Sequence, residues 1–227
     1  MASKIVHVLY LNNYMPKLCA LTLPTLEGYA RKIGADFNLI TKRAFKEWPI
    51  TYEKMQVYTD GINADWNILL DADLIMHPDM PDITTFIQPP VVGCYTSFVR
   101  SIHFPENIYF KRHGGIVGIA TNFIVTSRMT HDLWIPFKEK ASEIVPTLKN
   151  PHQTDEYCVS TNLARYNLKY TGVTFPETIG KFYNLDVTTD AHGEEYGVEM
   201  AKRYMKANQM LDQSLIGMHE KRTPERI

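Results

Sequence analysis

Two carboxylates, Asp71 and Asp73, stand on either side of Ala72, directly after the apolar run from Trp66 to Leu70. Residues i and i+2 of an extended strand face the same way, so both acids could reach one ligand. Neighbouring carboxylates repel each other, and a hard divalent cation removes that cost. Mg²⁺ or Mn²⁺ binds one or two carboxylates and completes its shell with water and phosphate oxygens. The pair therefore predicts a Mn²⁺ or Mg²⁺ site for a diphosphate; the alternative is two solvated acids that cap a turn.

The elements before this pair must place it at the edge of a sheet. Strands are predicted over residues 4–11, 36–41 and 66–70, and helices over residues 21–33 and 52–63. Alternation of strand and helix indicates a parallel α/β sheet. The acids then lie at the carboxyl end of the third strand, where open α/β sheets bind ligands.

The second part of the chain is less regular, because prolines interrupt it after the acidic pair. Residues 98–115 are mixed in character and are expected to form a mobile loop, and the tail after Met218 is polar. Further strands are predicted over residues 91–95, 118–126, 169–173 and 181–185, and further helices over residues 154–166 and 193–217. Residues 129–145 are expected to be broadly helical apart from Pro136.

Composition limits the classes of partner. The chain has 24 Lys and Arg against 25 Asp and Glu, and this balance gives no reason to expect nucleic acid or a membrane surface as a partner. The apolar stretch near the N-terminus, residues 5–11, is too short for a membrane span. Cys19, Cys94 and Cys158 are widely spaced and odd in number, which favours reduced thiols in a cytoplasmic protein.

Residues 52–76 resemble the metal-dependent nucleotide-sugar glycosyltransferases of the GT-A fold, with glycogenin-like and fringe-like enzymes nearest in texture. The shared features are a basic residue, Lys54, on the helix before the acidic strand, and then the apolar strand over residues 66–70. The D-x-D motif over residues 71–73 and an apolar continuation over residues 74–76 follow. The resemblance implies one Rossmann-like α/β domain over residues 1–227, with a mostly parallel central sheet flanked by helices. It also implies a nucleotide-binding half, about residues 1–80, and an acceptor-side half, about residues 81–227.

The resemblance assigns donor-binding roles. Asp71 and Asp73 would bind the metal, with Asp71 near the ribose and Ala72 between them also part of the donor site, and Lys54 would approach the nucleotide or its phosphates. The base and ribose pocket would be lined by the first strand end and its loop, at Leu9, Tyr10, Leu11 and Asn12. A solvated helix face for Lys54, and an ordinary strand end for Tyr10 and Asn12, are the alternatives.

The acceptor side is implied by two further segments. Gly114-Gly115 and residues 120–123 resemble the stretch that leads to the acceptor, although the glycines equally suit a simple turn. Asp155 and Glu156 resemble an acidic pair that opens a helix and faces the sugar or acceptor, where one could be the general base of an inverting transfer. Acids also suit the first turn of any helix.

One departure concerns the third metal ligand. Many glycogenin-like enzymes place a His just after a short late strand, where this chain has Asn184. An Asn carbonyl binds a hard cation more weakly than a charged ligand does, and His192 is a nearby substitute. Lys181, at the start of the same strand, would meet a phosphate.

The expected activity is transfer of a sugar from a nucleotide-diphosphate sugar, with UDP as the expected nucleotide, to a hydroxyl of a glycan, a lipid-linked sugar or a protein. A phosphohydrolase of the haloacid-dehalogenase type also carries D-x-D after a strand, but usually on the first strand. A non-catalytic nucleotide-sugar-binding protein is the other alternative, if the late ligand has been lost.

Overall fold

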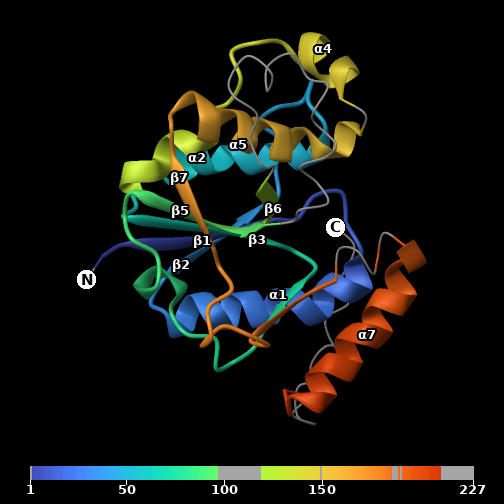
Figure 1. Ribbon diagram of the computed structural model, residues 1–227. Coiled ribbons are helices and arrows are strands. Elements are labelled where there is room, and N and C mark those ends of the chain that lie inside the picture. The colour runs from blue at the N-terminus through green and yellow to red at the C-terminus, as the bar shows by residue number, and fades with distance from the viewer. Residues whose placement is uncertain (1, 97–118, 149, 186–188, 190, 211–227) are drawn as a thin grey trace.

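The computed structural model describes residues 2–96, 119–148, 150–185, 189 and 191–210, and has helices on both faces of a six-stranded sheet (Figure 1). Helix α1 (Pro16–Lys32) covers one face. Helix α5 (Thr154–Arg165) and the 3-10 helix η1 (Ile50–Gln56) cover the other. The predicted α/β class, with a central sheet flanked by helices, is confirmed.

The main sheet has the strand order β2-β1-β3-β6-β5-β7. Of these six strands, β6 alone runs antiparallel to its neighbours, so the expectation of a mostly parallel sheet is also confirmed. Because β6 runs the opposite way, its first residues meet the carboxyl ends of β1 and β3 at one edge. The strands are β1 (Lys4–Leu9), β2 (Asp36–Ile40), β3 (Trp66–Asp71), β5 (Val91–Thr96), β6 (Ile119–Ser127) and β7 (Lys169–Gly172).

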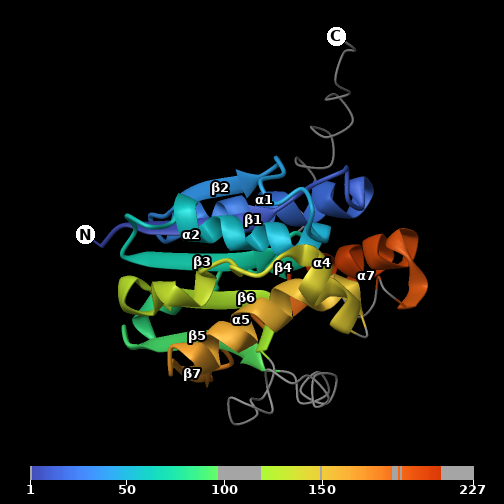
Figure 2. The ribbon, with the colours of Figure 1, turned by 90° about the horizontal axis from the view of Figure 1, so that it is seen from above.

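A second, two-stranded sheet follows the acidic pair. Strand β4 (Leu74–Met76) runs antiparallel to β8 (Phe182–Asn184). The sequence pattern does not predict β4, because three residues are too few to show an alternation. Beside this small sheet, helix α7 (Glu194–Ala207) packs against the N-terminal part of α1, with Leu18, Ile75 and Ala201 in their shared core. Viewed from above, α7 lies at the end of the main sheet toward which β1 and β2 run (Figure 2).

Three predicted helices have different limits in the structure. The helix expected over residues 21–33 begins earlier, because Pro16 suits a first helical position. The helix expected over residues 52–63 is η1 followed by a single α-helical turn, α2 (Val57–Asp60). The helix expected over residues 193–217 ends at Ala207, because Gln209 adopts a left-handed φ of 55°; residues 211–217 lie outside the described part.

The stretch over residues 129–145, expected to be broadly helical apart from Pro136, is helical only in short turns. Prolines at 136 and 146 lack the N–H that a continuous helix needs, so this stretch divides into short turns. They are the 3-10 helix η4 (Arg128–Trp134), helix α4 (Ala141–Ile144) and the 3-10 helix η5 (Val145–Thr147). Two further 3-10 helices are η2 (Ile83–Thr85) and η6 (Pro151–Gln153).

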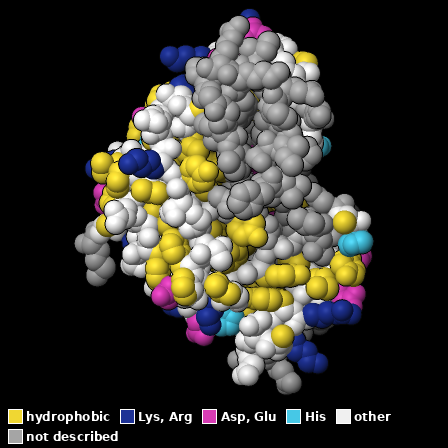
Figure 3. All heavy atoms as spheres, in the orientation of Figure 1, with side chains coloured by type: hydrophobic (Ala, Val, Ile, Leu, Met, Phe, Trp, Pro, Cys, Tyr) yellow, Lys and Arg dark blue, Asp and Glu magenta, His cyan; other side chains and the backbone are white. Residues whose placement is uncertain are grey.

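The described surface carries both signs of charge. Basic and acidic side chains both appear around the visible rim of the face in Figure 3, with apolar side chains between them. Among the helices of the described residues, none combines the length and the apolar character that crossing a bilayer requires.

His7, in the middle of β1, is fully buried as a neutral imidazole. Its Nε2 lies 2.9 Å from Asn67 Oδ1, and the Asn38 side-chain amide lies 3.0 Å from its Nδ1. These contacts suit a ring that donates from Nε2 and accepts at Nδ1. Burial lowers the pKa of His7 from 6.5 to about 4, although the hydrogen bond to Asn67 opposes this. Protonation would leave a buried cation facing the Asn38 donor.

We expect His7 to make the fold acid-sensitive. Its folded pKa lies below the unfolded value, so between pH 6.5 and 4 the unfolded chain binds the extra proton and stability falls as pH falls. The expected loss from pH 7 to pH 4 is about 3 kcal/mol. Urea unfolding at both pH values, for the wild type and for His7→Gln, separates this term from the carboxylates. An equal loss in both proteins would contradict it.

Candidate active site

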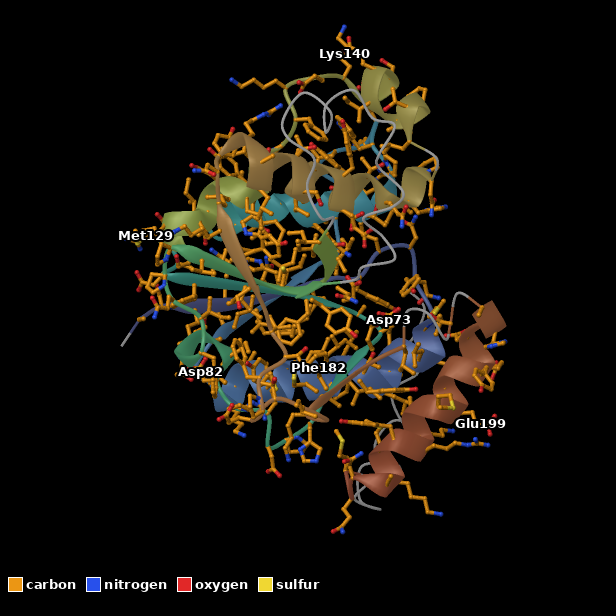
Figure 4. The ribbon with its side chains drawn as sticks, viewed as in Figure 1. Asp73, Asp82, Met129, Lys140, Phe182 and Glu199 are labelled. Atoms are coloured by element: carbon orange, nitrogen blue, oxygen red, sulfur yellow. The ribbon has the colours of Figure 1, made fainter. Side chains whose placement is uncertain are left out.

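Asp71 and Asp73 lie where β3 passes into β4, at the end of the main sheet that the carboxyl ends of its parallel strands form. Asp71 is the last residue of β3, and Ala72 and Asp73 form a turn. The expectation that an extended strand aligns the two acids is therefore wrong, although both line one pocket. The Ala72 carbonyl accepts a hydrogen bond from the Thr22 hydroxyl of α1, which fixes the turn. Asp73 lies at the end of the sheet, near the first turn of α1 (Figure 4).

Lys54 on η1 is buried and joins two of the pocket's carboxylates. Its Nζ lies 2.6 Å from Asp71 Oδ1 and 3.1 Å from Asp155 Oδ2, and it donates to Thr121 Oγ1 at 3.0 Å. Burial alone would lower the pKa of Lys54, but the charges of Asp71 and Asp155 outweigh burial and raise it. With only 6% of its surface exposed, Lys54 does not lie on a solvated helix face.

The N-terminal turn of α5 supplies Asp155 and Glu156, which are 2% and 3% exposed. Asp155 Oδ2 accepts from the Thr121 hydroxyl at 2.5 Å as well as from Lys54. Its Oδ1 is buried and has no hydrogen-bond partner within the described part of the chain. One oxygen of Asp155 is thus fixed by protein groups, while the other makes no hydrogen bond to the described residues.

The loop from β1 to α1 forms the opposite wall. Asn12, Asn13 and Met15 have left-handed φ angles of 53°, 54° and 40°. Asn tolerates this region, whereas a residue such as Met pays about 1 kcal/mol there. The bends carry Tyr14 into the pocket, where its hydroxyl donates to Asp73 Oδ2 at 3.1 Å.

Between these walls lies a pocket of about 370 Å³. Four carboxylates and one ammonium are among the described residues that line it, so its charge is strongly negative. The lining residues are Leu9, Leu11, Asn12, Tyr14, Ile50, Thr51, Lys54, Asp71, Ala72, Asp73, Thr121, Asn150, His152, Gln153, Asp155 and Glu156.

Most of the predicted site residues come together in this pocket, although their individual roles stay predictions. Asn184 is placed beside it, because Asn184 pairs with Leu74 and the next amide, of Leu185, donates to the Asp73 carbonyl. Tyr10 is not among the lining residues; its hydroxyl donates to Asn13.

Lys181 and His192 are not among the lining residues either. Lys181 lies beyond the opposite end of β8 from Asn184, and its Nζ is 3.6 Å from Asp79. His192 is exposed and its ring packs edge-on against Tyr196. Gly114 and Gly115, together with the loop predicted over residues 98–115, lie outside the described residues. Within the described ranges, no group of three or more His, Cys, Asp or Glu side chains is placed to hold a metal ion.

Sequence reasoning did not single out several pocket residues, and it included Thr121 only in the stretch over residues 120–123 that was expected to lead to the acceptor. Tyr14 follows the Asn12-Asn13 pair, whose tolerance of left-handed φ is a usable turn signal. Thr121 lies at a register shift: Cys94 of β5 pairs with Ile124, but the next residue, Tyr95, pairs with Ala120. Such bulges often re-aim side chains beside active sites. The remaining missed residues are Ile50, Thr51, Asn150, His152 and Gln153.

The fold is similar to that of a solved glycosyltransferase. A glycosyltransferase involved in the glycosylation of the major capsid of PBCV-1 aligns with a TM-score of 0.55 and 14% identity, over 87% of this chain and 99% of that chain. The galactosyltransferase LgtC, in complex with donor and acceptor sugar analogs, aligns with a TM-score of 0.43 and 11% identity, over 74% of this chain and 73% of that one.

These alignments bear on the fold alone. The first likeness confirms the expected GT-A fold, while the second is too loose to add to it. No protein-family model matches the sequence, and no curated sequence matches it either.

Proposed function

We propose that this protein is a metal-dependent glycosyltransferase that moves a sugar from a UDP-sugar to a hydroxyl acceptor. The observation that carries the proposal is the placement of Asp71 and Asp73 on one pocket at the carboxyl edge of the sheet. Edges of this kind are where open α/β sheets bind nucleotides. The fold, similar to that of a glycosyltransferase, is compatible with this chemistry.

The pocket's charge supports a divalent cation. An anionic diphosphate would be repelled by Asp71, Asp73, Asp155 and Glu156, and among the described lining residues Lys54 is the one ammonium that opposes them. Carboxylate and amide oxygens suit Mn²⁺ or Mg²⁺, which keep several ligand positions for water and phosphate. Asp71 and Asp73 would hold the ion, with Asn184 as a candidate third ligand. The ion would neutralise the charge that develops on the diphosphate leaving group.

The protein's own groups then have distinct tasks. Lys54 keeps Asp71 and Asp155 in place, and Tyr14 orients Asp73. The buried Oδ1 of Asp155 can accept a hydrogen bond from a sugar hydroxyl. If transfer inverts the sugar, Asp155 or Glu156 is the candidate base for the acceptor proton.

A transfer assay tests this function. The protein is incubated with a panel of UDP-, GDP- and ADP-sugars, Mn²⁺ and acceptors that include water, simple glycosides and a lipid-linked sugar. We expect release of the nucleotide diphosphate, dependent on Mn²⁺ and enhanced by one acceptor class. Hydrolysis of sugar phosphates without release of nucleotide would instead support a phosphohydrolase, and nucleotide-sugar binding without turnover would support a non-catalytic binding protein.

A further inference from the structure

Helix α1 lacks an N-terminal cap of its own. The residue before it, Met15, makes no capping hydrogen bond with its side chain, and Pro16 has no N–H to donate. The next two amides, of Lys17 and Leu18, donate to Glu194 Oε1 at 2.8 Å and 3.3 Å. The cap of the first helix thus comes from the last described helix, far away in sequence.

Close packing holds α7 at this position. A side chain added at Gly197 would come within 2.5 Å of Thr189 and 3.3 Å of Leu18, so the start of α7 lies directly against the start of α1. Leu18 and Ala201 are fully buried in the core that the two helices share. The position of Glu194 relative to the α1 amides is therefore fixed by the packing of α7 against α1.

The capped turn is also the end of the pocket loop. The loop that precedes Pro16 contains the left-handed residues Asn12, Asn13 and Met15, and it places Tyr14 against Asp73. Within it, the Tyr14 amide donates to the Leu11 carbonyl at 3.1 Å. Since Met15 is an unfavourable residue for this conformation, the loop needs both ends anchored. Strand β1 anchors one end, and the Glu194 cap anchors the other.

We propose that Glu194 is a positioning residue for the donor pocket: by capping α1 it holds the loop over residues 10–15 in the shape that directs Asn12 and Tyr14 into the site. This role rests on the proposed function, because the donor nucleotide is the ligand that the loop would serve. Glu194 itself is not among the residues that line the pocket.

Three variants of the full chain separate capping from charge. Glu194→Asp keeps the charge at the start of α7 but shortens the side chain, so it should not reach both amides. Glu194→Gln keeps the length and an acceptor oxygen but removes the charge. Glu195→Ala is the matched control, because Glu195 stands next to Glu194 and forms an exposed ion pair with the Lys17 side chain.

The test is calorimetric titration with UDP and Mn²⁺. We expect Glu194→Asp to weaken binding by about fivefold, the effect of losing a good helix cap, while Glu194→Gln and Glu195→Ala stay within about twofold of the wild type. The reverse order, with Gln weak and Asp normal, would mean that charge alone matters and would overturn the proposal. Equal binding by all four proteins would overturn it as well.

Hydrogen exchange without ligand keeps this test separate from the proposed function. In Glu194→Asp we expect faster exchange at the Lys17 and Leu18 amides and also at the Tyr14 amide. Faster exchange at Lys17 and Leu18 with an unchanged Tyr14 would show a cap that does not hold the loop, and would overturn the proposal. A wild type that binds no UDP would count against the function, while the Tyr14 amide would still decide the role of Glu194.

Discussion

Replacing Asp73 by Ala is expected to abolish the dependence of UDP binding on Mn²⁺ while the fold stays intact. Asp73 is one of the two carboxylates at the β3–β4 turn, and a divalent cation with one remaining carboxylate from this turn would bind far more weakly. The expected loss of affinity in the presence of Mn²⁺ is more than about 100-fold, which corresponds to about 3 kcal/mol. Titration with UDP, with and without Mn²⁺, measures it.

The pocket's negative charge also predicts how UDP binds when no metal is present. Without metal, UDP should bind poorly to the wild type and no worse to Asp73→Ala, because the variant removes a repelling carboxylate. Asp79→Ala is the matched control: Asp79 also follows β4 closely, but its side chain is 72% exposed and pairs with His77 and Lys181 rather than with the pocket. Metal-dependent binding by Asp73→Ala equal to that of the wild type would refute the metal site.

Replacing Lys54 by Met is expected to destabilise the fold by about 3 kcal/mol. The change removes the ammonium from a buried cluster and leaves Asp155, which is 2% exposed, without this counter-charge. For a chain of this size the loss corresponds to a fall of about 10 °C in the melting temperature. Urea unfolding at pH 7 gives the free energy directly.

A double variant identifies the cause. When Asp155→Asn is combined with Lys54→Met, the buried side chain at position 155 becomes a neutral amide that can still bond to Thr121. We therefore expect at least half of the lost stability to return. Asp71 does not need to be neutralised in the same way, because its side chain is 20% exposed and water can solvate its charge. A double variant as unstable as Lys54→Met alone would show that lost packing, and not unpaired charge, is responsible.

The sequence was a good guide wherever one element carries its own signal. The buried run of β3 ends at Asp71, and that pattern alone predicts both the strand and the acids at its end. The acidic first turn of α5 is likewise readable from Asp155 and Glu156. The local sequence pattern indicates which face of an element is buried and where the element ends. The end of β3 and the start of α5 can be predicted from that pattern alone.

Features that depend on contacts between distant segments were not predictable. Lys54 contacts Thr121 and Asp155 because of two distant elements. The bulge in β6 presents Thr121, and the approach of α5 brings Asp155. Tyr14 reaches Asp73 only because the loop before α1 adopts left-handed angles, which a cap from Glu194 at the other end of the chain supports. No spacing rule within a segment contains this information.

The choice of a candidate for the late metal ligand depends on a contact of the same kind. The resemblance pointed to Lys181 for a phosphate and to His192 as a substitute metal ligand, and neither lines the pocket in the described structure. Asn184 is the late residue that the β4–β8 pairing brings beside Asp73. The position of Asn184 is decided by the pairing of β8 with β4, and β4 is too short to be recognised in the sequence.

The most direct measurement is the melting temperature of the wild type with UDP and Mn²⁺ together, with each alone, and with sugar phosphates plus Mg²⁺. Saturating UDP with Mn²⁺ should raise the melting temperature by about 5 °C or more, and UDP in the presence of EDTA should not. A rise with sugar phosphates and Mg²⁺, and none with UDP and Mn²⁺, would contradict a nucleotide-diphosphate site at Asp71 and Asp73.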